Sequence, residues 1–94
     1  MAVTLKFLGA LRHASGKETL TLDCKEGASL LDLVDSVTKH LPALRHNLLD
    51  EQLETPKPNA LILVNGKEIS VLNGLETQLK DGDEVVFVPV VHGG

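Results

Sequence analysis

The sequence has 94 residues, which allows one small domain with a single hydrophobic core. Thirteen acidic residues outnumber nine lysines and arginines, and the net charge of −4 argues against a nucleic-acid partner, since phosphate binding needs clustered cations. No apolar run is long enough to cross a bilayer and the first residues lack a signal-peptide pattern, so we expect a cytoplasmic protein without a membrane contact. Cys24 is the only cysteine, which excludes an internal disulfide and a paired-cysteine metal site.

The chain begins with two segments of strand character. Apolar and polar residues alternate over residues 3–7, which predicts a strand with one buried face. Residues 9–17 have glycines near both ends, and we expect a loop there. Residues 19–23 alternate again, so the two strands should form an antiparallel hairpin with a long turn.

A helical period follows. Ser29 and Asp32 have the spacing of a capping box, in which each side chain bonds the other's backbone N–H. The helix that follows should end or bend at Leu41, because Pro42 disfavours helical geometry in the residue before it. A proline is accepted in a first helical turn, so a second short helix over 43–49 is expected. The apolar positions that define the helical period are Leu30, Leu33, Val34, Val37, Leu41 and Leu44.

The second half of the chain reads mainly as strands. Residues 50–59 are polar and contain two prolines, which predicts a surface loop. Residues 60–64 form a continuous apolar strand, and Asn65-Gly66 is a strong signal for a hairpin turn. Residues 67–69 should form a short return strand.

The last elements complete the predicted fold. Residues 72–79 make a compact connector and residues 84–89 a final strand. The order β-β-α-β-β with a connector before the last strand predicts an α+β fold of the β-grasp (ubiquitin-like) type. Its mixed sheet should have four to five strands, with the first and last parallel at the centre and one main helix on one face. We expect this domain to span 1–90, with 91–94 as a flexible tail.

The final strand suggests a partner surface. A strand exposed on one face should alternate in polarity, whereas residues 85–88 are apolar throughout. The face away from the helix should then carry exposed apolar surface, or a loop or the short helix should cover it. The interface candidates are Phe7, Val86, Phe87, Val88 and Pro89.

The tail carries the one special chemical group. Glycine has no Cβ, so Gly93 and Gly94 can enter a slot too narrow for side chains, and Val91 and His92 belong to the same tail that would enter a partner's channel. The α-carboxylate of Gly94 is ionised at neutral pH and must be activated before anything can attack it. The alternative is an ordinary frayed terminus without a role.

Three stretches carry a family resemblance, namely Val64-Asn65-Gly66, the run Leu79-Lys80-Asp81-Gly82-Asp83-Glu84-Val85, and Gly93-Gly94. Together they resemble the MoaD/ThiS family of sulfur carriers, and the archaeal-type MoaD branch most closely. The resemblance implies that a MoeB-like, ubiquitin-activating-like enzyme uses ATP to adenylate Gly94, which then becomes a thiocarboxylate. It also implies that sulfur passes to a molybdopterin precursor within a MoaE-like large subunit of molybdopterin synthase. The chain itself would bind no cofactor or metal and would not be an enzyme on its own.

His92 leaves the acceptor open. A His-Gly-Gly ending resembles the eukaryotic ubiquitin-related modifier, which implies tRNA thiolation or conjugation to target-protein lysines. His92 is otherwise a tolerated polar residue on an exposed tail. A third hypothesis is a β-grasp binding module whose tail has no role. Asp81, Asp83 and Glu84 could form a carboxylate cluster, but an Asp-Gly-Asp sequence is more typical of a turn.

Overall fold

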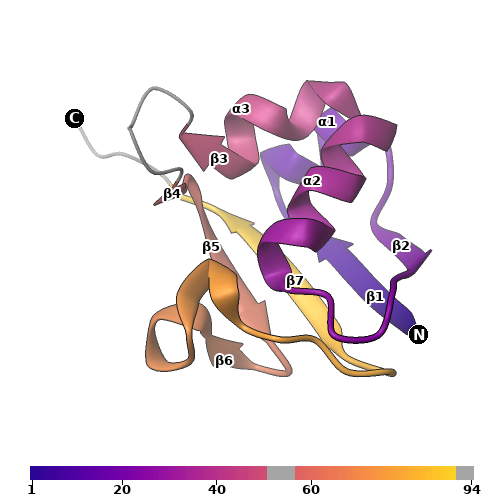
Figure 1. Cartoon of the computed structure of the whole chain (residues 1–94). Helices are drawn as coiled ribbons and strands as arrows, with labels where there is room; N and C mark the ends of the chain where they lie inside the picture. Colours follow the sequence, from indigo (N-terminus) through magenta and orange to yellow (C-terminus); the bar gives the residue numbers. More distant parts are fainter. Residues whose placement is uncertain (51–56, 91–94) are drawn as a thin grey trace.

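The computed structural model describes residues 1–50 and 57–90. Its main sheet has the strand order β2-β1-β7-β5-β6, with β1 (Ala2–Phe7), β2 (Thr19–Asp23), β5 (Ala60–Val64), β6 (Lys67–Glu68) and β7 (Glu84–Pro89). The pair β1–β7 is parallel, and the other neighbours are antiparallel. Helix α2 (Leu30–His40) crosses one face of this sheet (Figure 1). The predicted β-grasp fold, with the first and last strands parallel at its centre, is confirmed.

The core lies between the sheet and α2. In the parallel pair, Phe7 lies opposite Phe87, and their rings stack with centroids 5.5 Å apart. Both side chains are completely buried, together with Leu5 and Ile62 on the neighbouring positions of the sheet. The only two aromatic residues of the chain are thus placed together where the two central strands meet the helix.

Helix α2 starts and ends where the sequence predicts. The Ser29 hydroxyl accepts from the Asp32 backbone N–H at 3.2 Å, and the Asp32 carboxylate accepts from the Ser29 N–H at 3.0 Å. The helix ends at His40, before Pro42. A 3-10 turn at Pro42–Leu44 leads into α3 (Arg45–Leu48), which confirms the second short helix.

The predicted loop over residues 9–17 is wrong, because this segment contains helix α1 (Ala10–Ser15). The helix has no side-chain cap and no acidic residue in its first turn. It is held by tertiary packing: Leu11 is buried in the core, and Gly16 closes the helix in a left-handed conformation with φ 71°. Six residues are too short for a helical period to stand out in the sequence.

The predicted loop over residues 50–59 is also wrong at both ends. Strands β3 (Leu49–Asp50) and β4 (Lys57–Pro58) form a separate antiparallel pair, and residues 51–56 lie outside the described chain. The connector before β7 contains two 3-10 turns, Ile69–Val71 and Gly74–Glu76.

The residues that resemble the family motif connect two turns: the turn between β5 and β6, and the turn at residues 80–83 that precedes β7. Asn65 (φ 50°) forms the β5–β6 turn, and its side-chain amide donates to the buried Asp83 carboxylate at 2.8 Å. The other Asp83 oxygen accepts from the Lys80 N–H, also at 2.8 Å, and the Asn65 side-chain oxygen accepts from the Glu84 N–H. Asp83 therefore organises a turn, as its sequence context predicts, and the motif serves the scaffold that begins β7.

Candidate functional site

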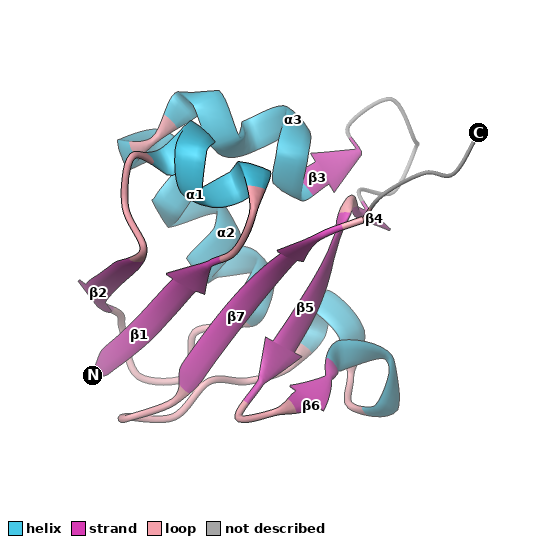
Figure 2. Ribbon diagram, turned by 180° about the vertical axis from the view of Figure 1, so that it is seen from behind, coloured by secondary structure: helices cyan, strands magenta, loops and turns pink. Residues whose placement is uncertain are grey.

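The sheet face opposite α2 carries an apolar patch. It consists of Leu61 and Leu63 on β5 with Val86 and Val88 on β7, and we call these four residues the open-face patch. Leu61 lies opposite Val88 and Leu63 opposite Val86, so the four side chains lie on one face. Leu61 is 39% exposed and the other three are half-buried. Within residues 1–50 and 57–90, no helix lies over β1, β7 and β5 when the sheet is viewed from this side (Figure 2).

Charged residues border the patch on one side, and apolar residues continue it on the other. Lys6 on β1 forms an ion pair with Glu84 on β7, with 3.2 Å between Nζ and Oε2. Toward the carboxyl ends of β1 and β7, Leu8 is 43% exposed and Val90 is 48% exposed. Exposed apolar surface thus extends from the open-face patch toward the residues that lead into the tail.

The structure separates the predicted interface candidates. Phe7 and Phe87 as interface residues are wrong: their side chains face α2 and have no exposed surface. Val86, Val88 and Pro89 keep partial exposure and remain candidates. Leu61 and Leu63 were missed, although an apolar run over 60–64 already indicated that both faces of this strand are apolar.

The predicted tail residues Val91, His92, Gly93 and Gly94 lie outside the described residues. The structure does define where the tail starts. Pro89 is the last residue of β7 and lies opposite Ala60, the first residue of β5. Gly94 as the reacting residue, and the three others as the part that enters a partner, stay predictions.

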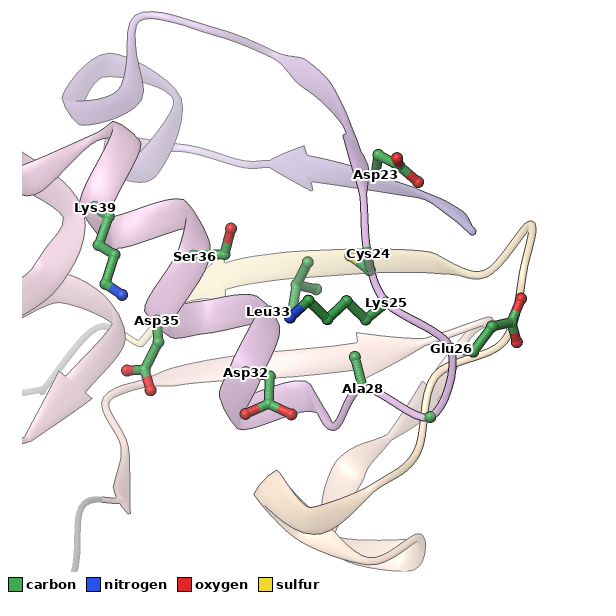
Figure 3. Close-up of a pocket in the computed structure, with 11 residues that line it drawn as sticks. Asp23, Cys24, Lys25, Glu26, Ala28, Asp32, Leu33, Asp35, Ser36 and Lys39 are labelled. Carbon is green, nitrogen blue, oxygen red and sulfur yellow. The ribbon is translucent and has the colours of Figure 1, made fainter.

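A hollow between the β2–α2 loop and α2 lies at the other end of the molecule (Figure 3). Acidic and basic side chains both line it, and Cys24 and Leu33 are among its apolar residues. Burial raises the pKa of the Cys24 thiol, so the lysine beside it does not activate it. Among the described residues, no group of histidines, cysteines or carboxylates is placed to hold a metal ion. Cys24 therefore fits its predicted role as a small apolar residue at a strand end.

We expect Cys24 to react slowly with iodoacetamide. The thiolate is the nucleophile, and a raised thiol pKa reduces its population at pH 8. The alkylation rate of the folded protein should be below that of the urea-unfolded chain, and the difference should narrow as the pH rises past the raised thiol pKa. Mass spectrometry of timed samples measures both rates, and a faster reaction in the folded protein would contradict the assignment.

The described helices include none that is long and apolar enough to cross a membrane. The fold and the open face together define a small ubiquitin-like protein: a β-grasp domain with a partly exposed apolar sheet face, over which none of the described helices lies, close to the start of its C-terminal segment. The model of the ThiS family matches residues 5–94. The chain therefore belongs to the ThiS family of ubiquitin-like sulfur carrier and modifier proteins.

Several relatives match this chain over its full length and theirs. Small archaeal modifier protein 3 of Haloferax volcanii is 30% identical over 94 residues. Ubiquitin-related modifier 1 homolog 1 of Arabidopsis thaliana is 35% identical over 104 residues. Both are named as modifiers.

Solved structures show the same fold. The small archaeal modifier protein 1 of Methanosarcina acetivorans is 38% identical, with a TM-score of 0.82 over 99% of this chain and 96% of that one. A putative molybdopterin converting factor subunit 1 from Pyrococcus furiosus is 25% identical, with a TM-score of 0.77 over 97% and 99% of the two chains. A chain of the BexX/CysO complex of Amycolatopsis orientalis is 30% identical, with a TM-score of 0.75 over 98% and 99%.

Proposed function

We propose that this chain is a ubiquitin-like modifier that also carries sulfur on the carboxyl group of Gly94. The observation that carries the proposal is the full-length similarity to proteins named as modifiers, which covers this chain from its first residue to Gly94. The molybdopterin role suggested by the motif resemblance becomes the second candidate.

The proposed chemistry proceeds in two steps. A Gly94 carboxylate oxygen attacks the α-phosphorus of ATP on a separate activating enzyme, which releases pyrophosphate and forms an acyl-adenylate. A nucleophile then attacks the carbonyl carbon, and AMP leaves with the bonding electrons. Hydrosulfide as the nucleophile gives the thiocarboxylate after losing a proton, and a lysine amine gives an isopeptide after losing a proton. This chain supplies the reacting carboxyl group, while ATP and the catalytic side chains belong to the activating enzyme.

The open-face patch suits the docking step. Its apolar side chains are partly exposed on the sheet, and one of its two strands, β7, leads directly into the tail. An activating enzyme seated on the patch would therefore lie close to the place where the tail begins. Contiguous exposed apolar residues of this kind usually mark a protein interface.

The second candidate function is the small subunit of a molybdopterin synthase. The similarity to the Pyrococcus furiosus molybdopterin converting factor subunit favours it. The first step is the same in both proposals, and only the acceptor differs: a MoaE-like subunit instead of lysines or a tRNA-thiolation enzyme.

Intact mass of the denatured chain, isolated from its native cells, tests these alternatives. A ladder of isopeptide-linked conjugates would support the modifier, and a single species with sulfur in place of one oxygen would favour a dedicated carrier. The isolated chain is then incubated with the activating enzyme, ATP and a sulfur donor, and its mass is measured again. A chain that stays unmodified in cells and is not converted in this mixture would contradict both proposals.

We expect Leu61→Asp to weaken docking of the activating enzyme. Leu61 is 39% exposed, so a carboxylate remains hydrated and the domain stays folded, but it would be buried unpaired in the interface. We expect kcat/KM for adenylation to fall about tenfold or more, mainly through KM, since 1.4 kcal/mol of lost binding corresponds to a factor of 10. The rate of ATP–pyrophosphate exchange, measured at several concentrations of each variant, gives kcat and KM for adenylation.

Val71→Asp is the matched control, because Val71 is 74% exposed and lies in a 3-10 turn outside the open-face patch. This variant should retain wild-type kinetics. Equal losses in the two variants would show that added negative charge, and not the patch, is responsible.

A further inference from the structure

The start of the tail is held from both sides. Because β1 and β7 are parallel, their carboxyl ends meet at the same edge of the sheet, and the Leu8 N–H donates to the Phe87 carbonyl at 3.1 Å. On the other side of β7, Ala60 lies opposite Pro89. Beyond Leu8 the chain turns away into α1, and the residue at this turn is Gly9.

Gly9 differs from the other described glycines that have positive φ. A Cβ added to Gly9 would lie 3.0 Å from Cγ of Pro89 and 3.7 Å from its Cδ. The corresponding Cβ at Gly16, Gly27, Gly66, Gly74 or Gly82 would meet nothing within 4 Å. Those five positions need glycine only for the backbone, whereas position 9 needs it for the backbone (φ 54°, ψ −131°) and for the proline ring.

We propose that Gly9 is a positioning residue for the tail: the space left by its missing side chain sets where the Pro89 ring lies and so the direction in which the tail leaves the sheet. The activity part of this inference rests on the proposed function, and the geometric part does not.

The length of the tail makes the position of the Pro89 ring important for the position of the Gly94 carboxyl group. When the activating enzyme holds the tail extended in its channel, the five residues after Pro89 span at most about 17 Å, so a change of about 20° in the direction at Pro89 would displace the Gly94 carboxyl group by up to about 6 Å. A misplacement of about 1 Å in a reacting group can cost a factor of about 10² in rate. A small displacement of the proline ring is therefore enough to affect the reaction.

The test compares Gly9→Ala with Gly74→Ala. Both glycines have nearly equal φ, 54° and 57°, so both variants strain the backbone, but only the first adds a clash with Pro89. The first readout needs no partner: amide shifts in ¹⁵N–¹H spectra of isotope-labelled protein. Gly9→Ala should move the resonances of Val90 and of the tail residues next to it, and Gly74→Ala should leave them unchanged.

The second readout is pyrophosphate exchange with the activating enzyme. Gly9→Ala should lower kcat about tenfold and keep KM, because the open-face patch is intact and only the reacting group is misplaced. In a Pro89→Ala background, which removes Cγ, the same substitution should cost at most about twofold. A merely structural role for Gly9 would give the same loss in both backgrounds.

Each outcome decides one claim. Unshifted tail resonances in Gly9→Ala, equal shifts in Gly74→Ala, or no relief by Pro89→Ala would overturn the inference. A wild-type chain that is not adenylated would defeat the proposed function, and the spectra would still decide the position of the tail. If Gly9→Ala does not fold, the double variant Gly9→Ala/Pro89→Ala, which lacks Cγ of Pro89, should recover the fold. Failure to recover it, while Pro89→Ala alone folds, would overturn the inference.

Discussion

Deletion of Gly93 and Gly94 should abolish adenylation and leave the domain as stable as before. The shortened chain still ends in a carboxylate, now on His92, but this group falls short by about 7 Å, the length of two extended residues. Reaction requires the attacking atoms to approach within about 3–3.5 Å. Pyrophosphate exchange should therefore drop to background, while the urea midpoint stays unchanged because the described core ends at Phe87.

The matched control for this deletion keeps the length of the tail. Gly93→Ala restores the reach but adds a methyl group where we expect a narrow channel, so partial activity should return. Wild-type exchange in the deletion variant would show that Gly94 is not the activated residue and would leave the β-grasp binding module as the better hypothesis.

Phe87→Asp should unfold the domain. Phe87 has no exposed surface and stacks on Phe7, so the substitution removes a large apolar group and buries a carboxylate without a partner. Such changes cost more than about 4 kcal/mol, a large part of the 5–15 kcal/mol that stabilises a typical domain. Circular dichroism should show loss of the native spectrum, or a urea midpoint far below that of the wild-type chain.

Val88→Asp provides the comparison for Phe87→Asp, because it places the same charge one residue further along β7, on the opposite face. Val88 is half-buried in the open-face patch, so this variant should fold and lose docking of the activating enzyme. A folded Phe87→Asp variant with normal docking would contradict the assignment of Phe87 to the core.

The sequence predicts those parts of the fold whose cause is local. Ser29 and Asp32 specify the start of α2, Pro42 its end, and Asn65-Gly66 the β5–β6 turn, and each acts through its immediate neighbours. Helix α1 was not predicted, because it is stabilised by burial of Leu11 in the core and not by a capping residue or a visible helical period in the sequence. Strands β3 and β4 have two residues each, which is too short for any period to be visible.

The site was predictable only in part, for a related reason. An apolar run over 85–88 shows that both faces of β7 avoid polar side chains, but it does not say which residue lies on which face. The pairing with β1 and β5 decides it, and this pairing assigned Phe87 to the core and added Leu61 to the exposed surface. Gly9 and Pro89 are 80 positions apart in the sequence, and the residues next to either of them do not indicate that the two lie close together.

The strand order has a consequence for biosynthesis. The strand that occupies the centre of the sheet, β7, follows every other strand of the sheet in the sequence, and its pairing with β1 joins residues such as Thr4 and Glu84. While β7 is still inside the ribosome, the strand pairs β2-β1 and β5-β6 are not hydrogen-bonded to each other, because β7 is the strand that lies between them in the sheet. The complete sheet can then form only after nearly the whole chain has been synthesised, and truncated products that lack β7 cannot adopt the native fold. The order of translation thereby ensures that a tail is presented only by a domain that has all its strands.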